Sequence, residues 1–163
     1  MKILNRIIQK MNNSNQKNKK LETVFNDENN DYYGDLLTAI VKAQRLKLND
    51  VALDAKMDPR VFQNVRSKTA KDRRTITRFE ALRVAVVLNL PPRYTKLLLE
   101  RMNVALPLYT NSDMALAAVI YTNHNTSEEF EIRLKCLEII EKNALDFSCD
   151  FENEFKKINL EDK

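Results

Sequence analysis

Glycine and proline are scarce in this sequence, which has one glycine and four prolines among 163 residues. Sheet proteins need both residues at their many turns, so this scarcity argues against a β-rich fold. Long windows rich in leucine, alanine, lysine and glutamate favour helices instead. Hydrophobic residues make up 44% of the chain, which is enough for a core. We therefore predict an all-α protein with one core-bearing domain.

Residues that bind metals or cofactors are equally sparse. Cys136 and Cys149 are isolated cysteines, which fits a reducing, cytoplasmic compartment. His124 is the single histidine and has no local cysteine or carboxylate partners at zinc-site spacing. Gly34 alone cannot form a glycine-rich phosphate loop. No window approaches the roughly eighteen apolar residues of a membrane span. We expect no metal, no cofactor, no membrane insertion and no enzymatic activity.

Positive charge is concentrated in the middle of the chain. Residues 59–101 contain eleven Lys/Arg and three Asp/Glu, a net charge of +8. Residues 1–58 have a net charge of +2, and residues 102–163 have a net charge of −6. A basic middle before an acidic end predicts one polyanion-binding face, although an ordinary solvated surface would show the same balance.

The most informative stretch is residues 46–68, which predicts two short helices joined by a tight turn. Asp58 and Pro59 form a start signal for the second helix, as cap and first helical residue. Its apolar side holds Phe62 and Val65, and its polar side holds Arg60, Gln63, Asn64 and Arg66. Amides pair with adenine, and guanidinium groups pair with guanine or phosphate. The pattern predicts a major-groove reader, although any amphipathic surface helix has a similar polar side.

The whole chain divides into four predicted regions. Residues 1–31 are a flexible arm, rich in asparagine and charge, in which Leu21, Val24 and Phe25 could form a docking turn. Residues 32–105 form the domain that contains the helix pair joined by the tight turn, residues 106–147 a helical extension packed on it, and residues 148–163 an acidic tail. Capping-box spacing marks two helix starts, at Thr77 with Glu80 and at Thr126 with Glu129. The predicted helices cover about 35–45, 48–56, 59–68, 77–90, 92–103, 112–122 and 126–143.

Several positions match a known family in their pattern. Around the turn, apolar residues stand at Leu46, Val51, Ala52, Met57, Phe62 and Val65, and Ala85, Leu88 and Leu90 follow in the fourth helix of the domain. This pattern, over roughly residues 35–103, resembles the phage-repressor-like helix-turn-helix family, also called Xre or lambda-repressor-like. The resemblance implies a five-helix core of that type with two further C-terminal helices, and it implies that these apolar residues around the turn are buried.

The resemblance also implies roles for individual residues. The 59–67 helix would enter the major groove, with Arg60, Gln63 and Asn64 at the base edges. Phosphates would be contacted from the end of the helix and the following loop by Arg66, Lys68, Lys71, Arg73 and Arg74. Three residues depart from the family pattern: Leu48 replaces a glutamine, and Lys56 and Lys68 replace glycines. A lysine in a left-handed conformation costs about 1 kcal/mol relative to glycine.

The function predicted from these patterns is non-catalytic, sequence-specific binding of double-stranded DNA by a small transcriptional regulator. The alternative is a protein-interaction module on the same fold that has lost DNA binding, similar to an antitoxin or a sigma-factor partner. A homodimer through residues 112–143 is a further expectation. The apolar residues of that region suit either the protein's own core or a two-fold seam: Ile120, Tyr121, Phe130, Leu134, Leu137 and Ile140.

Overall fold

The computed structural model describes the backbone of residues 2–104, 106 and 110–143. Within these residues there are eight α-helices, one short 3₁₀ helix and no strand, which confirms the all-α prediction. The elements are α1 (Lys2–Asn26), η1 (Glu28–Asn30), α2 (Tyr33–Ala43), α3 (Leu48–Asp54), α4 (Pro59–Arg66), α5 (Arg78–Leu88), α6 (Pro92–Arg101), α7 (Asn111–Ile120) and α8 (Ser127–Asn143). The predicted acidic tail and Cys149 lie outside the described residues.

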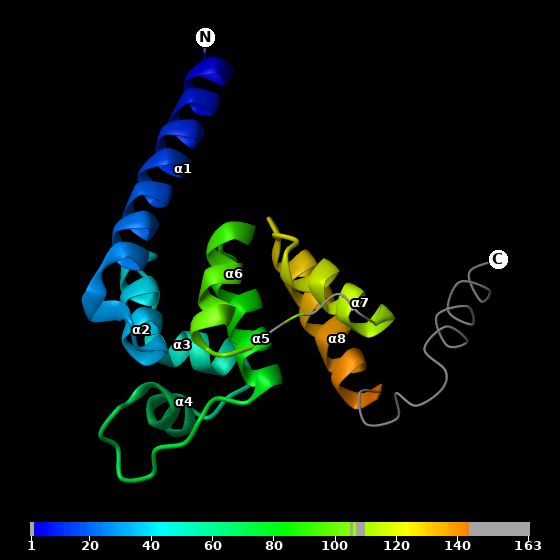
Figure 1. The fold of residues 1–163 in the computed structure, drawn as a ribbon. Helices are drawn as coiled ribbons and strands as arrows, with labels where there is room; N and C mark the ends of the chain where they lie inside the picture. Colours follow the sequence, from blue (N-terminus) through cyan, green and yellow to red (C-terminus); the bar gives the residue numbers. More distant parts are fainter. Residues whose placement is uncertain (1, 105, 107–109, 144–163) are drawn as a thin grey trace, which may run out of the picture.

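Helix α5 is the centre of the arrangement and contacts α3, α6, α7 and α8 (Figure 1). Helices α1 and α2 pack together on one side of it, and α7 and α8 stand on the other side. Among the candidates for core or dimer seam, Ile120, Leu134, Leu137 and Ile140 are buried and belong to the core. Tyr121 and Phe130 are half-buried and pack against that core. A dimer seam would have to use other residues.

The prediction of a flexible arm over residues 1–31 differs from the structure, because residues 2–26 form the single helix α1. Residues 13–20 are all exposed, whereas Leu21 and Phe25 are buried. The Phe25 ring lies 5.1 Å from the ring of Tyr94 on α6, measured between centroids. Leu21 and Phe25 are four residues apart and fix the last turns of α1 on the bundle. Once these turns have formed, each further residue adds one hydrogen bond without a new nucleation cost, so the helix can continue through polar residues. The sequence pattern predicts only a docking turn there.

Side-chain caps fix most of the helix starts. The Asp58 carboxylate accepts a hydrogen bond from the backbone N–H of Arg60 at 2.7 Å, which confirms the predicted start of α4. Thr77 and Glu80 form the predicted reciprocal capping box of α5. At α8, Thr126 accepts from the N–H of Glu129 at 3.2 Å, but the Glu129 carboxylate accepts from the N–H of Asn125 instead. Thr126 is therefore a cap without the full predicted box.

Four non-glycine residues have a positive φ in the described part of the chain: Arg45, Lys56, Asn89 and Asn103. Lys56 has φ 55° and stands in the turn between α3 and α4, so the turn keeps a left-handed residue without glycine. Lys68 needs no glycine, because Ser67, the residue after α4, already has extended backbone, with φ −80° and ψ 135°, and Lys68 itself has no positive φ. Leu46 is 43% exposed, a departure from its expected burial, since the left-handed Arg45 redirects the chain just before it.

Replacing Lys56 with glycine is expected to raise the free energy of unfolding by about 1 kcal/mol, because glycine adopts positive φ without strain. The ion pair between Lys56 Nζ and Glu138, at 3.7 Å, is exposed and offsets little of this gain. Urea denaturation followed by circular dichroism measures the change. Lys56→Ala is the matched control, since it removes the ion pair but keeps the strain. A glycine variant no more stable than the alanine variant would contradict the argument.

Candidate nucleic-acid interface

The candidate interface is built on α4, which lies at the edge of the bundle with the loop to α5 extending beyond it (Figure 1). Phe62 and Val65 are buried on its inner side, where α4 contacts α2 and α3. On its outer side Arg60 and Gln63 are exposed, and Asn64 is half-buried. The predicted base-reading side of the helix is therefore open to a partner.

The end of α4 packs closely against the beginning of α2. Gly34 is buried, and a Cβ atom built on it would lie 1.9 Å from the backbone oxygen of Arg66. The hydroxyl of Tyr32 donates to the backbone oxygen of Val65 at 3.4 Å. These contacts set the direction of α4 relative to α2. The sequence shows the lone glycine but does not indicate which backbone approaches it.

Arg66 is engaged within the protein. Its Nη1 donates to Thr38 Oγ1 at 2.9 Å, and its guanidinium lies 4.8 Å from the centre of the Phe62 ring. Burial lowers the pKa of the Arg66 guanidinium from its usual range. In this arrangement Arg66 ties α4 to α2, which is a different role from the predicted phosphate contact.

Two of the predicted loop cations, Lys68 and Arg73, lie close to the ring of Tyr32. Lys68 Nζ lies 3.0 Å from the Asp35 carboxylate and 5.0 Å from the centre of the Tyr32 ring. The Arg73 guanidinium lies 5.6 Å from the same ring, and its Nη1 donates to the backbone oxygen of Lys68 at 3.3 Å. Both side chains remain exposed. They are positioned beside α4 and still face solvent.

Arg74 is held by the capping box of α5. Its two terminal nitrogens donate to the two carboxylate oxygens of Glu80 at 3.0 and 2.6 Å. Burial alone would raise the pKa of Glu80, but the hydrogen bonds from Arg74 and Thr77 outweigh it and lower that pKa. A phosphate contact by Arg74 would have to replace this bidentate pair.

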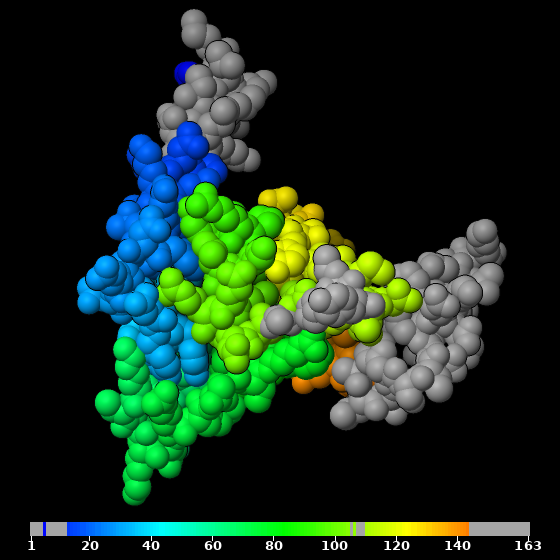
Figure 2. Space-filling model, viewed as in Figure 1, coloured from blue at the N-terminus to red at the C-terminus, as the bar shows by residue number. Residues whose placement is uncertain are grey.

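Lys71 completes the predicted set and lies in the loop between α4 and α5, which protrudes at the lower edge of the molecule (Figure 2). Lys71 is exposed, and neither it nor Arg60 has an ion-pair partner among the residues whose positions are described. The structure thus brings all eight predicted residues to one end of the molecule. Arg66 and Arg74 are held by side-chain hydrogen bonds within the protein, and the exposed Lys68 is paired with Asp35.

A shallow hollow beside α4 was missed by sequence reasoning. It has a volume of about 500 Å³ and lies between α2 and the start of α3. Thr38, which binds Arg66, is part of its lining, so the hollow adjoins the end of α4. Lys42 and Lys47 add two exposed cations to it. In the sequence, only the positions of these two lysines at the two ends of the α2–α3 connection indicate that a hollow could lie there.

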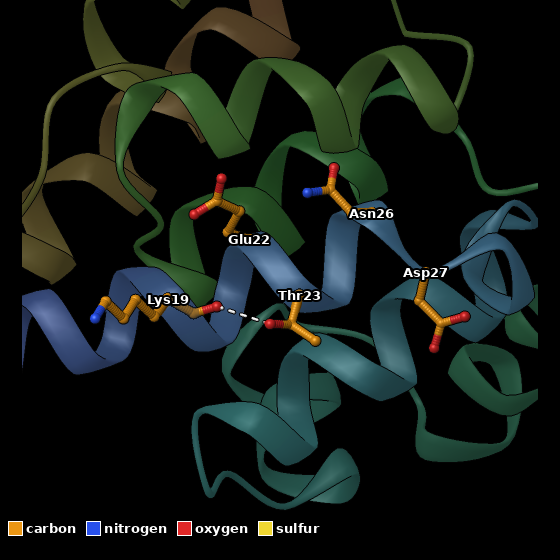
Figure 3. Close-up of a pocket in the computed structure, with 5 residues that line it drawn as sticks. All are labelled: Lys19, Glu22, Thr23, Asn26 and Asp27. Atoms are coloured by element: carbon orange, nitrogen blue, oxygen red, sulfur yellow. Dashed lines mark hydrogen bonds between the residues drawn. The ribbon is translucent and has the colours of Figure 1, made fainter.

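A larger hollow, of about 630 Å³, lies along the last turns of α1. Its polar side chains diverge: Glu22 and Asn26 point to one side of the helix, and Thr23 and Asp27 point to the other (Figure 3). The Thr23 hydroxyl donates back to the Lys19 backbone oxygen at 3.0 Å. Nothing in this hollow places an acid and a base around a common point.

In the described residues, no helix has the length and apolar character needed to cross a bilayer. Comparison of the chain with protein-family models, with curated proteins and with solved structures finds no match. The resemblance to the phage-repressor-like family therefore rests on residue pattern alone.

Proposed function

We propose that this protein is a non-catalytic, sequence-specific DNA-binding protein, a small transcriptional regulator that inserts α4 into the major groove. The observation that carries the proposal is the open polar side of α4. Arg60 and Gln63 are exposed there, while Phe62 and Val65 anchor the opposite side. Helices α2 to α6 would form the lambda-repressor-like core, with α3 and α4 as the helix-turn-helix.

The predicted site residues fall into three groups by their contacts and exposure. Arg60, Gln63 and Asn64 are the base-edge candidates, because they lie on the outer side of α4. Lys68, Lys71 and Arg73 are exposed in or near the loop and suit phosphate contacts. Arg66 and Arg74 position α4 and the loop through Thr38 and Glu80. In this scheme the last two residues act on DNA binding through geometry.

Gln63→Ala is expected to weaken binding to the preferred site by about 1–3 kcal/mol and to leave binding to random DNA nearly unchanged. The preferred site is first obtained by selection from a random duplex pool, and affinities are then measured by titration. Lys71→Ala should weaken both duplexes alike and reduce the salt slope by about one. Asn111→Ala, an exposed amide on α7, is the matched control. Equal losses on both duplexes for Gln63→Ala would contradict base reading by that residue.

The competing candidate is a protein-interaction module on the same fold. It is favoured by two exposed leucines, Leu46 just before α3 at 43% and Leu53 on α3 at 61%, and by Leu48 in place of the family's glutamine. A gel-shift titration with random genomic DNA at two salt concentrations separates the candidates. Binding that weakens steeply with salt supports DNA binding, and its absence at low salt supports the interaction module.

A further inference from the structure

His124, the single histidine of the chain, lies in the connection between α7 and α8. It is half-buried, and the centre of its ring lies 5.0 Å from that of Phe130. Its Nδ1 atom lies 2.8 Å from Nη1 of Arg133, a buried residue of α8. A guanidinium group only donates hydrogen bonds, so the imidazole accepts this one at Nδ1 and carries its single proton on Nε2. This contact therefore exists only while His124 is neutral.

The backbone of His124 is bound to the end of α5 through the side chain of Asn89. The His124 N–H donates to Asn89 Oδ1 at 3.1 Å, and Asn89 Nδ2 donates to the His124 backbone oxygen at 2.9 Å. Arg133 Nη1 donates to the same Asn89 oxygen at 3.3 Å. One side-chain amide thus joins the α7–α8 connection, the end of α5 and Arg133, so a change at the imidazole acts where three helices meet.

Protonation of His124 would turn this attractive contact into a repulsive one. An imidazolium group has an N–H on both ring nitrogens and no acceptor, so Arg133 would lose its hydrogen bond and face a second positive charge. Arg133 stays charged at every ordinary pH. It is also held in place, because its Nε and Nη2 donate to the backbone oxygens of Val119 and Ile120. The half-buried His124 is therefore the partner that moves toward solvent.

Two charged groups act on the titration of His124, and both belong to α8. Burial lowers the pKa of the imidazole most, the charge of Arg133 lowers it further, and the charge of Glu129 raises it. Asn89, the residue of the α5 end that contacts His124, is neutral. The net change lowers the pKa of His124 below its ordinary value of about 6.5. The unfolded chain thus binds this proton more readily, so stability is full above about pH 6.5 and is lost as the pH falls toward the folded pKa.

We propose that His124 is a pH-sensitive switch: a proton on its imidazole releases the connection between α7 and α8 from Arg133 and from the end of α5. The last turns of α8 are fixed separately, because Arg83 of α5 donates to the Glu141 carboxylate at 2.9 Å. Acid therefore loosens the start of α8 and leaves its end attached. This inference involves no DNA, and it goes beyond the proposed DNA binding.

Proton NMR titration of the imidazole tests the first step, and a single histidine makes its Cε1–H resonance unambiguous. The wild-type midpoint is expected below about 6.5. Glu129→Gln should lower the midpoint further, because it removes the negative charge but keeps an oxygen that accepts from the N–H of Asn125. A wild-type midpoint at or above the ordinary value would overturn the proposal, and this readout needs no variant to fold.

Urea denaturation at about pH 7.5 and about pH 5.5 tests the consequence, since ordinary carboxyl groups titrate below this interval. The urea midpoint of the wild type is expected to be lower at the acid pH. His124→Asn is the matched variant, because its amide oxygen accepts from Arg133 and does not titrate. Its midpoint should change much less between the two pH values. Circular dichroism should show the same helix content at both, because the release is local.

Amide hydrogen exchange locates the release. The protection of the His124 N–H, relative to an unstructured peptide at the same pH, should fall in acid in the wild type and persist in His124→Asn. Equal changes of the urea midpoint in the wild type and in the asparagine variant would overturn the proposal. So would a wild type that loses stability in acid while the His124 N–H stays protected. None of these readouts depends on DNA, so each leaves the test of Gln63 and Lys71 standing.

Discussion

Replacing Gly34 with alanine is expected to lower the free energy of unfolding by about 3 kcal/mol, at the upper end of what overpacking costs. The added Cβ would lie 1.9 Å from the backbone oxygen of Arg66 and 2.6 Å from its carbonyl carbon. It would also lie 2.6 Å from a ring carbon of Tyr32. The tyrosine side chain can rotate away, but the Arg66 contact is backbone, so α4 itself must shift.

Helix propensity alone gives the opposite sign for this substitution. Glycine inside a helix is about 1 kcal/mol less favourable than alanine, and Gly34 lies in the first turn of α2. Urea denaturation of the variant therefore distinguishes the two effects by direction. Asp35→Ala is the matched control, because it changes the next residue and removes only an exposed ion pair with Lys68 and one acidic side chain from the first turn of α2, each of which contributes at most about 1 kcal/mol. An alanine variant more stable than the wild type would show that α4 does not pack on α2 as described.

Helix positions were predictable wherever local chemistry sets them. Asp58 with Pro59, and Thr77 with Glu80, mark the starts of α4 and α5 in both the sequence and the structure. The expected burial of Val51, Ala52, Met57, Phe62 and Val65 is also confirmed. These signals come from residues within a few positions of each other. They predict the structure well because no contact with a distant residue changes the local conformation at these positions.

What the sequence could not show are contacts between distant residues. The extent of α1 depends on burial of Leu21 and Phe25 against other helices. The engagement of Arg66 depends on Thr38, which is 28 positions away. The pairing of Arg74 with Glu80 is closer, but the sequence pattern already assigns Glu80 to the capping box and gives no sign of a second partner. The charge pattern therefore locates these cations in the sequence but does not show that Arg66 and Arg74 have partners within the protein.

Arg133 on α8 is a second residue whose role the sequence hides. Its side chain is buried, with 7% of the residue exposed. Its Nε donates to the backbone oxygen of Val119 at 3.0 Å, and its Nη2 donates to that of Ile120 at 3.1 Å. It therefore satisfies two carbonyl groups at the end of α7, which would otherwise be unpaired. Its Nη1 lies 2.8 Å from Nδ1 of His124 and 3.3 Å from the side-chain oxygen of Asn89.

The same contacts connect α8 to both α7 and the end of α5. Asn89 follows α5 in a left-handed conformation, with φ 48°, and its side-chain nitrogen donates to the backbone oxygen of His124 at 2.9 Å. Burial lowers the pKa of His124, and the positive charge of Arg133 lowers it further. A neutral imidazole can accept from the guanidinium, so the lowered pKa is consistent with this geometry. One arginine thus holds three segments that are distant in sequence.

Arg133→Met is expected to lower the free energy of unfolding by about 2–4 kcal/mol, because methionine fills the space but leaves buried carbonyl groups without donors. Arg133→Lys should fall between methionine and the wild type, since one ammonium group cannot match the planar guanidinium on all its partners. Urea denaturation measures both, and Lys96→Met on the exposed side of α6 is the control, with an expected change within about 0.5 kcal/mol. Equal stability of the methionine variant and the wild type would mean that α7 and α8 are held by apolar contacts alone.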